Sequence, residues 1–163
     1  MSRKAEILEG LGGSVPALRR YSRALAAGAG HALSDDLVQS ALQSVGARIR
    51  ARELRPADLS DARIEAYAAL TAMAAKRLGH APRPGPRHPG IVHGLADLPF
   101  DDRAALLLVS LEGFGYEAAA RIVGAPRETL LARLTRARAA LAVEGLRAPD
   151  AARRAASHLR IVK

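Results

Sequence analysis

The sequence predicts an all-α protein built from two small helical domains, and three observations carry that prediction. Hydrophobic residues make up 49% of the chain but aromatic residues only 3%, and much of the apolar fraction is alanine. Small apolar side chains suit close-packed helices, whereas sheets favour β-branched and aromatic residues. Apolar residues also recur every three or four positions over most of the chain, as on one face of a helix. A segment rich in proline and glycine, residues 80–97, breaks this pattern and is expected to link the two domains.

The first domain is expected to cover residues 1–79 and to contain three helices. The first helix follows Ser14, a residue type that caps helix N-termini, and carries a proline in its first turn. The second is expected to open at Ser34, which places the carboxylates of the next two residues in its first turn, against the helix dipole. The third is expected to begin at Ser60 and to end at Gly79.

The second domain is expected to cover residues 98–147 and to contain three more helices. The first of these should span Ala104–Glu112, after a start signal at residues 98–101, and Gly113 should end it. Two further helices are predicted over Tyr116–Val123 and Arg127–Ala142. The basic tail, residues 148–163, is predicted to be either a short amphipathic helix or a disordered arm.

The last two helices form a helix-turn-helix pattern. Ala119 is small where the helices must approach, and Gly124 can adopt the positive φ of a tight turn. Such a turn holds the second helix so that its N-terminal part reaches base edges in DNA. The chain has a formal charge of +9, and the arginines clustered on this helix fit a polyanion. The alternative is an arginine-rich helical hairpin with a solvated face and no nucleic-acid role.

Several other classes of protein are not supported by the sequence. The chain has no cysteine, which excludes disulfides and thiolate metal sites. Its five histidines show no metal-ligand spacing, and neither a phosphate loop nor a nucleophile motif is present, so we expect no enzyme and no cofactor. Neither a signal-peptide core nor an apolar run long enough to span a bilayer is present. A cytoplasmic protein without membrane insertion is therefore expected.

Residues 113–138 resemble the fourth conserved region of bacterial extracytoplasmic-function (ECF) sigma factors. The resemblance includes the preceding helix, and its most specific part is the stretch RLTRAR at residues 133–138. In that family the last helix of this region binds the upstream (−35) promoter element. The resemblance therefore implies promoter contacts from seven residues of this chain: Arg127, Thr129, Leu131, Ala132, Arg133, Arg136 and Arg138.

The first domain resembles the second conserved region of the same family, through residues 18–25 and the acidic stretch at 34–39. In the family this acidic helix docks on core RNA polymerase, which implies polymerase contacts from Asp35, Asp36 and Gln39. Ordinary first-turn acidity is the alternative role for the two carboxylates. The two resemblances follow the family's order and have a linker between them.

Two functions follow from the resemblance. The first is a sigma factor of a stress response that binds core RNA polymerase, promoter DNA and an anti-sigma factor. The second is a decoy, like the sigma-like domain of some alphaproteobacterial stress regulators, that binds an anti-sigma factor without recognising a promoter. The decoy would explain why apolar Leu131 and Ala132 stand where many members have lysine and serine, since apolar side chains make no bidentate base contacts. It would also explain Tyr67, expected in the core, where the family usually has tryptophan. The positive charge favours the sigma factor, and so does the lack of space for a receiver domain, which such decoys normally carry.

Overall fold

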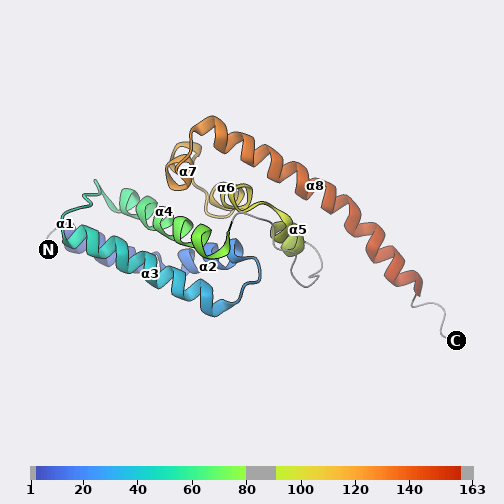
Figure 1. Ribbon diagram of the computed structural model, residues 1–163, viewed down its shortest axis with the longest axis horizontal. Coiled ribbons are helices and arrows are strands. Elements are labelled where there is room, and N and C mark those ends of the chain that lie inside the picture. Colours follow the sequence, from blue (N-terminus) through green and yellow to red (C-terminus); the bar gives the residue numbers. More distant parts are fainter. Residues whose placement is uncertain (1–2, 80–90, 159–163) are drawn as a thin grey trace.

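The computed structural model describes residues 3–79 and 91–158, and it confirms the all-α prediction (Figure 1). Within these residues the chain forms eight helices and no strand: α1 (Arg3–Gly13), α2 (Val15–Ala26), α3 (His31–Arg50), α4 (Leu59–Leu78), α5 (Ile91–Asp97), α6 (Phe100–Ser110), α7 (Tyr116–Val123) and α8 (Arg127–His158). None of these described helices is long and apolar enough to cross a membrane.

The first half of the chain packs around the apolar stripes of α2, α3 and α4. The repeating apolar residues of the sequence form these stripes, and Leu18, Leu37 and Leu70 are all at most 1% exposed. Two polar side chains lie in the same core, and each has a hydrogen-bond partner there. The hydroxyls of Tyr21 and Thr71 lie 2.9 Å apart and share a hydrogen bond.

The second half packs α6 and α7 against the first half of α8. Leu130 and Leu134 of α8 are buried against α6 and α7, as the predicted stripe requires. Gly124 ends α7 with a φ of +62°, a left-handed conformation that a residue with a Cβ adopts at a cost. The predicted helix-turn-helix is therefore present, with α7 and the start of α8 at the predicted residues.

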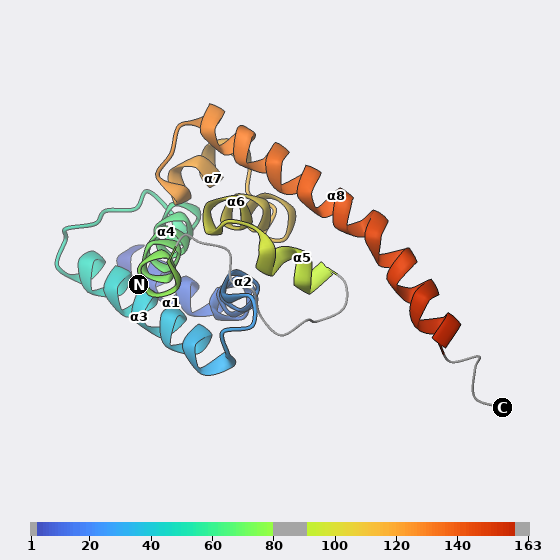
Figure 2. The same ribbon diagram turned by 45° about the vertical axis from the view of Figure 1, so that its right-hand side comes forward.

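The two halves share one hydrophobic core. Helix α6 packs on α2, and α7 packs on α4, as both views show (Figures 1 and 2). The buried apolar residues of all these helices belong to one continuous cluster. The described parts of the chain are therefore in a closed arrangement, with the helix-turn-helix resting on the first half.

The start of one predicted helix is confirmed without its expected cap, and the start of another is wrong. Helix α2 begins at Val15, directly after Ser14, as predicted. Ser14 itself has a helical backbone and makes no capping bond through its side chain, because α1, which was not predicted, runs almost directly into α2. Helix α3 begins at His31 and not at Ser34, whose buried hydroxyl donates to the Gly30 carbonyl. Asp35 and its neighbour therefore lie in the second turn of α3, where the helix dipole acts on them less.

Other boundaries also differ from the predictions. Helix α4 begins at Leu59, and the Asp58 carboxylate caps it by accepting from the backbone amide of Asp61 at 2.9 Å. Helix α6 begins and ends earlier than predicted, at Phe100 and Ser110.

The linker and the tail are only partly described. Helix α5 occupies residues 91–97 of the expected linker, whereas residues 80–90 lie outside the described residues. The tail is helical as far as His158, because α8 continues well beyond its predicted end, and residues 159–163 lie outside the described residues.

Candidate functional site

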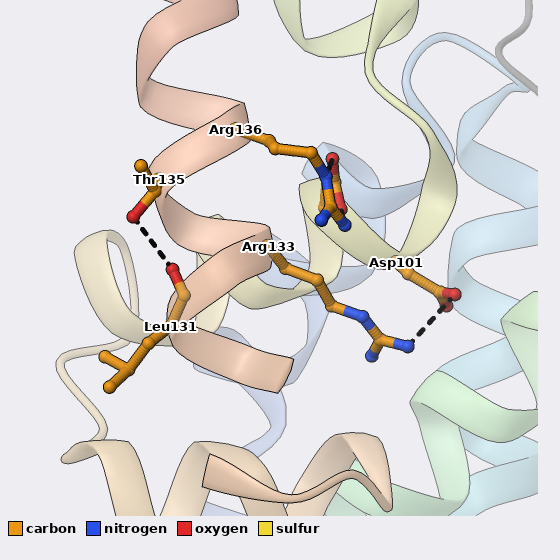
Figure 3. Close-up of polar contacts among 6 residues, drawn as sticks. Asp101, Leu131, Arg133, Thr135 and Arg136 are labelled. Carbon is orange, nitrogen blue, oxygen red and sulfur yellow. Dashed lines mark hydrogen bonds and ion pairs between the residues drawn. The ribbon is translucent and has the colours of Figure 1, made fainter. Parts of the chain in front are cut away.

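Two arginines of the candidate DNA-binding helix are held by acidic residues from the first turn of α6. Arg136 donates to both carboxylate oxygens of Asp102, from Nε at 3.1 Å and from Nη2 at 2.8 Å, and the Asp102 side chain is only 6% exposed. This hydrogen bond raises the pKa of the Arg136 guanidinium. Arg133 donates to Asp101 at 3.3 Å (Figure 3). Both arginines thus join α8 to α6, and their charges are already compensated.

The other predicted DNA-binding residues lie on α8 in two groups. Arg127, Thr129, Ala132 and Arg138 are exposed, whereas Leu131 is half-buried and packs against the core. Arg127 lies 3.3 Å from the exposed carboxylate of Glu117, a surface pair that is easily exchanged for another partner.

Between residues 127 and 143, where its side chains are described, the outward face of α8 carries no cation at its centre. Ala132, Thr135 and Ala139 are exposed and lie opposite the buried stripe at helical spacing. The Thr135 hydroxyl donates to the Leu131 carbonyl of its own helix at 3.0 Å (Figure 3). The arginines therefore flank this face, and the centre offers small side chains to a partner.

The predicted polymerase-binding residues lie near the start of α3. Asp35 is close to two arginines of α2, Arg19 at 3.3 Å and Arg23 at 3.8 Å. Asp36 pairs with Arg77 at 2.8 Å, and Gln39 is exposed. All these pairs are about half exposed, so they add little stability and leave the carboxylates accessible to a partner.

A buried carboxylate joins the two halves, and no pattern in the sequence indicated it. The Glu112 side chain, just after α6, is 1% exposed. It accepts two hydrogen bonds from Arg20 of α2, at 3.0 and 2.9 Å, and one from the Tyr67 hydroxyl of α4 at 2.7 Å. The hydrogen bonds from Arg20 to Glu112 raise the pKa of that guanidinium. We call Arg20, Tyr67 and Glu112 the interdomain triad.

An aromatic row continues from the triad. The Tyr67 ring, fully buried as predicted, packs edge-on against Phe114 with 4.9 Å between ring centroids. On its other side Tyr67 lies 5.3 Å from the Tyr21 ring. The Arg63 guanidinium sits 6.0 Å from the Phe114 centroid, within cation–π range. Phe114 follows α6, so the row connects the cores of the two halves.

Two further arginines hold the halves together. Arg103 of α6 is 2% exposed, and its guanidinium donates to the Leu25 carbonyl at 2.8 Å and to the Leu98 carbonyl at 3.0 Å. Arg121 of α7 donates to Asp61 of α4 at 3.1 Å. The pKa of Asp61 is lowered, first by the hydrogen bond from the Ala57 amide and then by Arg121.

The buried tyrosines predict a loss of stability in alkali. Burial raises the pKa of Tyr21 and of Tyr67 above the ordinary value, so the folded protein favours the neutral phenols. Their contribution is complete below the unfolded pKa of about 10 and is lost as the pH rises above it. The free energy of unfolding, measured by urea titration from pH 8 to about 11, should therefore fall more steeply for the wild type than for Tyr21→Phe. Equal slopes would contradict this account.

The described residues offer no site for a metal ion. Among them, no three or more His, Asp or Glu side chains are grouped to hold one. The hollows beside α2 are lined largely by Arg19, Arg20 and Arg23, which suits an anionic macromolecule better than a small substrate.

Comparison with known proteins gives a match to one family model and to solved structures. Residues 91–141 match the family model "Sigma-70, region 4", which therefore includes α5. The sigma factor RpoE from Bartonella quintana, solved in complex with the anti-sigma factor NepR, is 26% identical over 82% of this chain and 92% of that chain, with a TM-score of 0.55. No match was found among curated protein sequences.

A second similar structure is the anti-anti-sigma factor PhyR from Bartonella quintana, complexed with the anti-sigma factor NepR. It is 22% identical over 78% of this chain, with a TM-score of 0.60. The chain covers 46% of PhyR, so it spans just under half of that protein. Residues 91–141 thus match a sigma-70 region 4 domain, and the chain has the two-part helical fold of the sigma factor RpoE.

Proposed function

We propose that this chain is an ECF-type sigma factor that binds core RNA polymerase through α3 and promoter DNA through α8. The observation that carries the proposal is the similarity to the sigma factor RpoE, which extends over both halves and 92% of that protein. In the proposal, the closed arrangement is the resting form, and an anti-sigma factor holds it.

The proposed polymerase-binding surface is the acidic start of α3. Asp35, Asp36 and Gln39 lie on one accessible surface, and their present partners are half-exposed arginines. A basic surface of the polymerase can replace such weak pairs at little cost.

The proposed DNA-binding surface is α8, where Arg127 and Arg138 are exposed and, unlike Arg136, do not pair with a buried carboxylate. They would bind DNA phosphates, whereas Arg133 and Arg136 would keep α8 fixed on α6. Helix α7 rests on α4 in the closed form. In the proposal, the halves therefore separate before α3 binds the polymerase and α8 binds promoter DNA.

The salt dependence of DNA binding tests whether α8 binds DNA. The double variant Arg127→Ala/Arg138→Ala should lower the slope of log affinity against log salt by about two units, because each lost phosphate contact removes about one. The measurement is a fluorescence titration of a mixed-sequence duplex at several salt concentrations. The control Arg48→Ala/Lys76→Ala removes two exposed charges from the first half and should leave the slope unchanged. An unchanged slope in the α8 variant would contradict DNA binding by this helix.

Transcription in vitro tests the whole proposal. The chain, added to core RNA polymerase on genomic DNA of its own source, should give transcripts with defined 5′ ends. Asp35→Ala/Asp36→Ala should abolish core binding without unfolding the protein, since both carboxylates lie at the surface. Core polymerase that neither binds the chain nor initiates with it would refute the sigma-factor proposal.

The second candidate is a decoy that binds an anti-sigma factor and no promoter. The cation-free centre of α8 favours it, because Ala132 and Ala139 suit a protein surface better than base edges. Tight binding to a NepR-type anti-sigma factor, together with no transcription, would select the decoy. Transcription that the anti-sigma factor inhibits would select the sigma factor.

A further inference from the structure

A basic groove lies beside the first described helix, at the end of the chain where the described residues begin. Its volume is about 510 Å³, and α1, the end of α3 and the following loop form it. The floor is apolar and includes Ile7, Ile49 and Leu54. The rim carries four cations and no acidic residue: Arg3, Lys4, Arg52 and Arg55.

The rim cations are held in place without being neutralised. Arg3 donates to the Ala57 carbonyl, and the Lys4 ammonium donates to the Arg50 carbonyl at 2.9 Å. Within the described residues, none of the four rim cations forms an ion pair with a carboxylate. Their positive charge is therefore directed to whatever enters the groove.

Arg52 occupies a backbone conformation that normally requires glycine. Its φ is +62°, and its amide donates to the Ile49 carbonyl while the next amide donates to the Arg48 carbonyl. These two bonds are the Schellman pattern that ends a helix, in which glycine is the usual residue at this position. An arginine with this backbone conformation is strained, and strain of this kind is concentrated at functional positions.

We propose that this groove binds an acidic amphipathic helix of a partner protein. The apolar face of such a helix would lie on Leu54 and Pro56, beside the buried Ile7 and Ile49, and its carboxylates would lie along the cationic rim. Nucleic acid fits less well, because a sugar–phosphate backbone would satisfy the rim and leave the apolar floor uncovered. The groove is at the opposite end of α3 from Asp35, so this inference does not depend on the proposed function.

The test uses two labelled peptides and the full chain. One peptide forms a helix with leucine on one face and glutamate on its flanks, and the other has the same composition in scrambled order. We expect the first to bind more tightly, with affinity that falls as salt rises, and to shift the NMR signals of Ile7, Ile49 and Leu54. Equal binding of both peptides, or shifts elsewhere, would overturn the proposal.

Arg52→Gly separates binding from stability. Glycine relieves the left-handed strain, so the melting temperature should stay the same or rise, while peptide affinity falls about two- to fivefold. The control Lys76→Ala removes one charge at the far end of the α3–α4 hairpin and should not change peptide affinity. Unchanged affinity in Arg52→Gly would refute the docking role of the rim. A single-stranded oligonucleotide that binds the groove when the helical peptide does not would assign it to nucleic acid.

Discussion

Replacing Glu112 by alanine is expected to separate the two halves of the molecule. Its carboxylate is 1% exposed and accepts hydrogen bonds from Arg20 and Tyr67, which belong to the other half. Alanine leaves the Tyr67 hydroxyl without its acceptor and removes both bonds to Arg20. The expected cost is about 2 to 4 kcal/mol, since hydrogen bonds to a buried charge are lost. Small-angle X-ray scattering should show a larger radius of gyration, and urea unfolding should show a lower midpoint.

Matched variants distinguish the interdomain triad from a general loss of charge. Glu117→Ala removes a carboxylate that is 78% exposed on α7 and should change neither the radius nor the midpoint. Glu112→Gln keeps an acceptor for Tyr67 and should have an intermediate effect. A Glu112→Ala protein that stays as compact and stable as the wild type would show that the triad does not hold the halves together.

Arg103→Ala is expected to have an effect of similar size through a different contact. The buried guanidinium donates to the backbone carbonyls of Leu25 and Leu98, at the ends of segments from the two halves. Its loss leaves both carbonyls short of a donor and opens a cavity, at a cost of about 3 kcal/mol. The free energy of unfolding from urea titration measures this cost.

Two further variants test whether the loss of stability in Arg103→Ala comes from the buried guanidinium. Arg103→Lys keeps the charge but cannot place two donors in a fixed fork, so it should recover only part of the stability. Arg121→Ala removes a half-exposed arginine at the same interface and should cost less than 1 kcal/mol, as surface pairs do. An Arg103→Ala variant no less stable than Arg121→Ala would contradict the structural role of the buried guanidinium.

Local chemistry made some helices predictable from the sequence. The turn between α7 and α8 was predicted because Gly124 can adopt the positive φ that a tight turn needs, and because Pro126, two residues later, suits the position just before a helix. The apolar stripe of α8 was predicted for a similar reason, because Leu130 and Leu134 repeat at helical spacing. Gly79 likewise ended α4 as predicted.

The missed boundaries depend on tertiary contacts. Helix α1 carries only two buried residues, Ile7 and Leu11, which is too weak a pattern to identify without the helices that cover them. Ser34 resembled a cap in the sequence, but it is buried inside α3, and its carbonyl accepts from the Ser22 hydroxyl. Short polar side chains form caps and internal hydrogen bonds equally well, so their type alone does not place a helix start.

The residues of the candidate site could be predicted from the sequence, but the residues that they contact could not. Arg133 and Arg136 were predicted to face DNA because the resemblance implied promoter contacts from this helix and because its arginines are clustered. No periodicity reveals that Asp101 and Asp102, more than thirty positions away, approach them. The contact between Arg20 and Glu112 spans 92 positions and is invisible to any local pattern.

The contact between the halves also sets how the protein responds to concentration. Both halves belong to one chain, so closing is an intramolecular equilibrium, and dilution does not open it. A partner must instead compete with the high effective concentration that the covalent connection provides. Each loss of about 1.4 kcal/mol at the interface multiplies the open population about tenfold. Small changes at Glu112 or Arg103 therefore tune the fraction of molecules that a partner finds open.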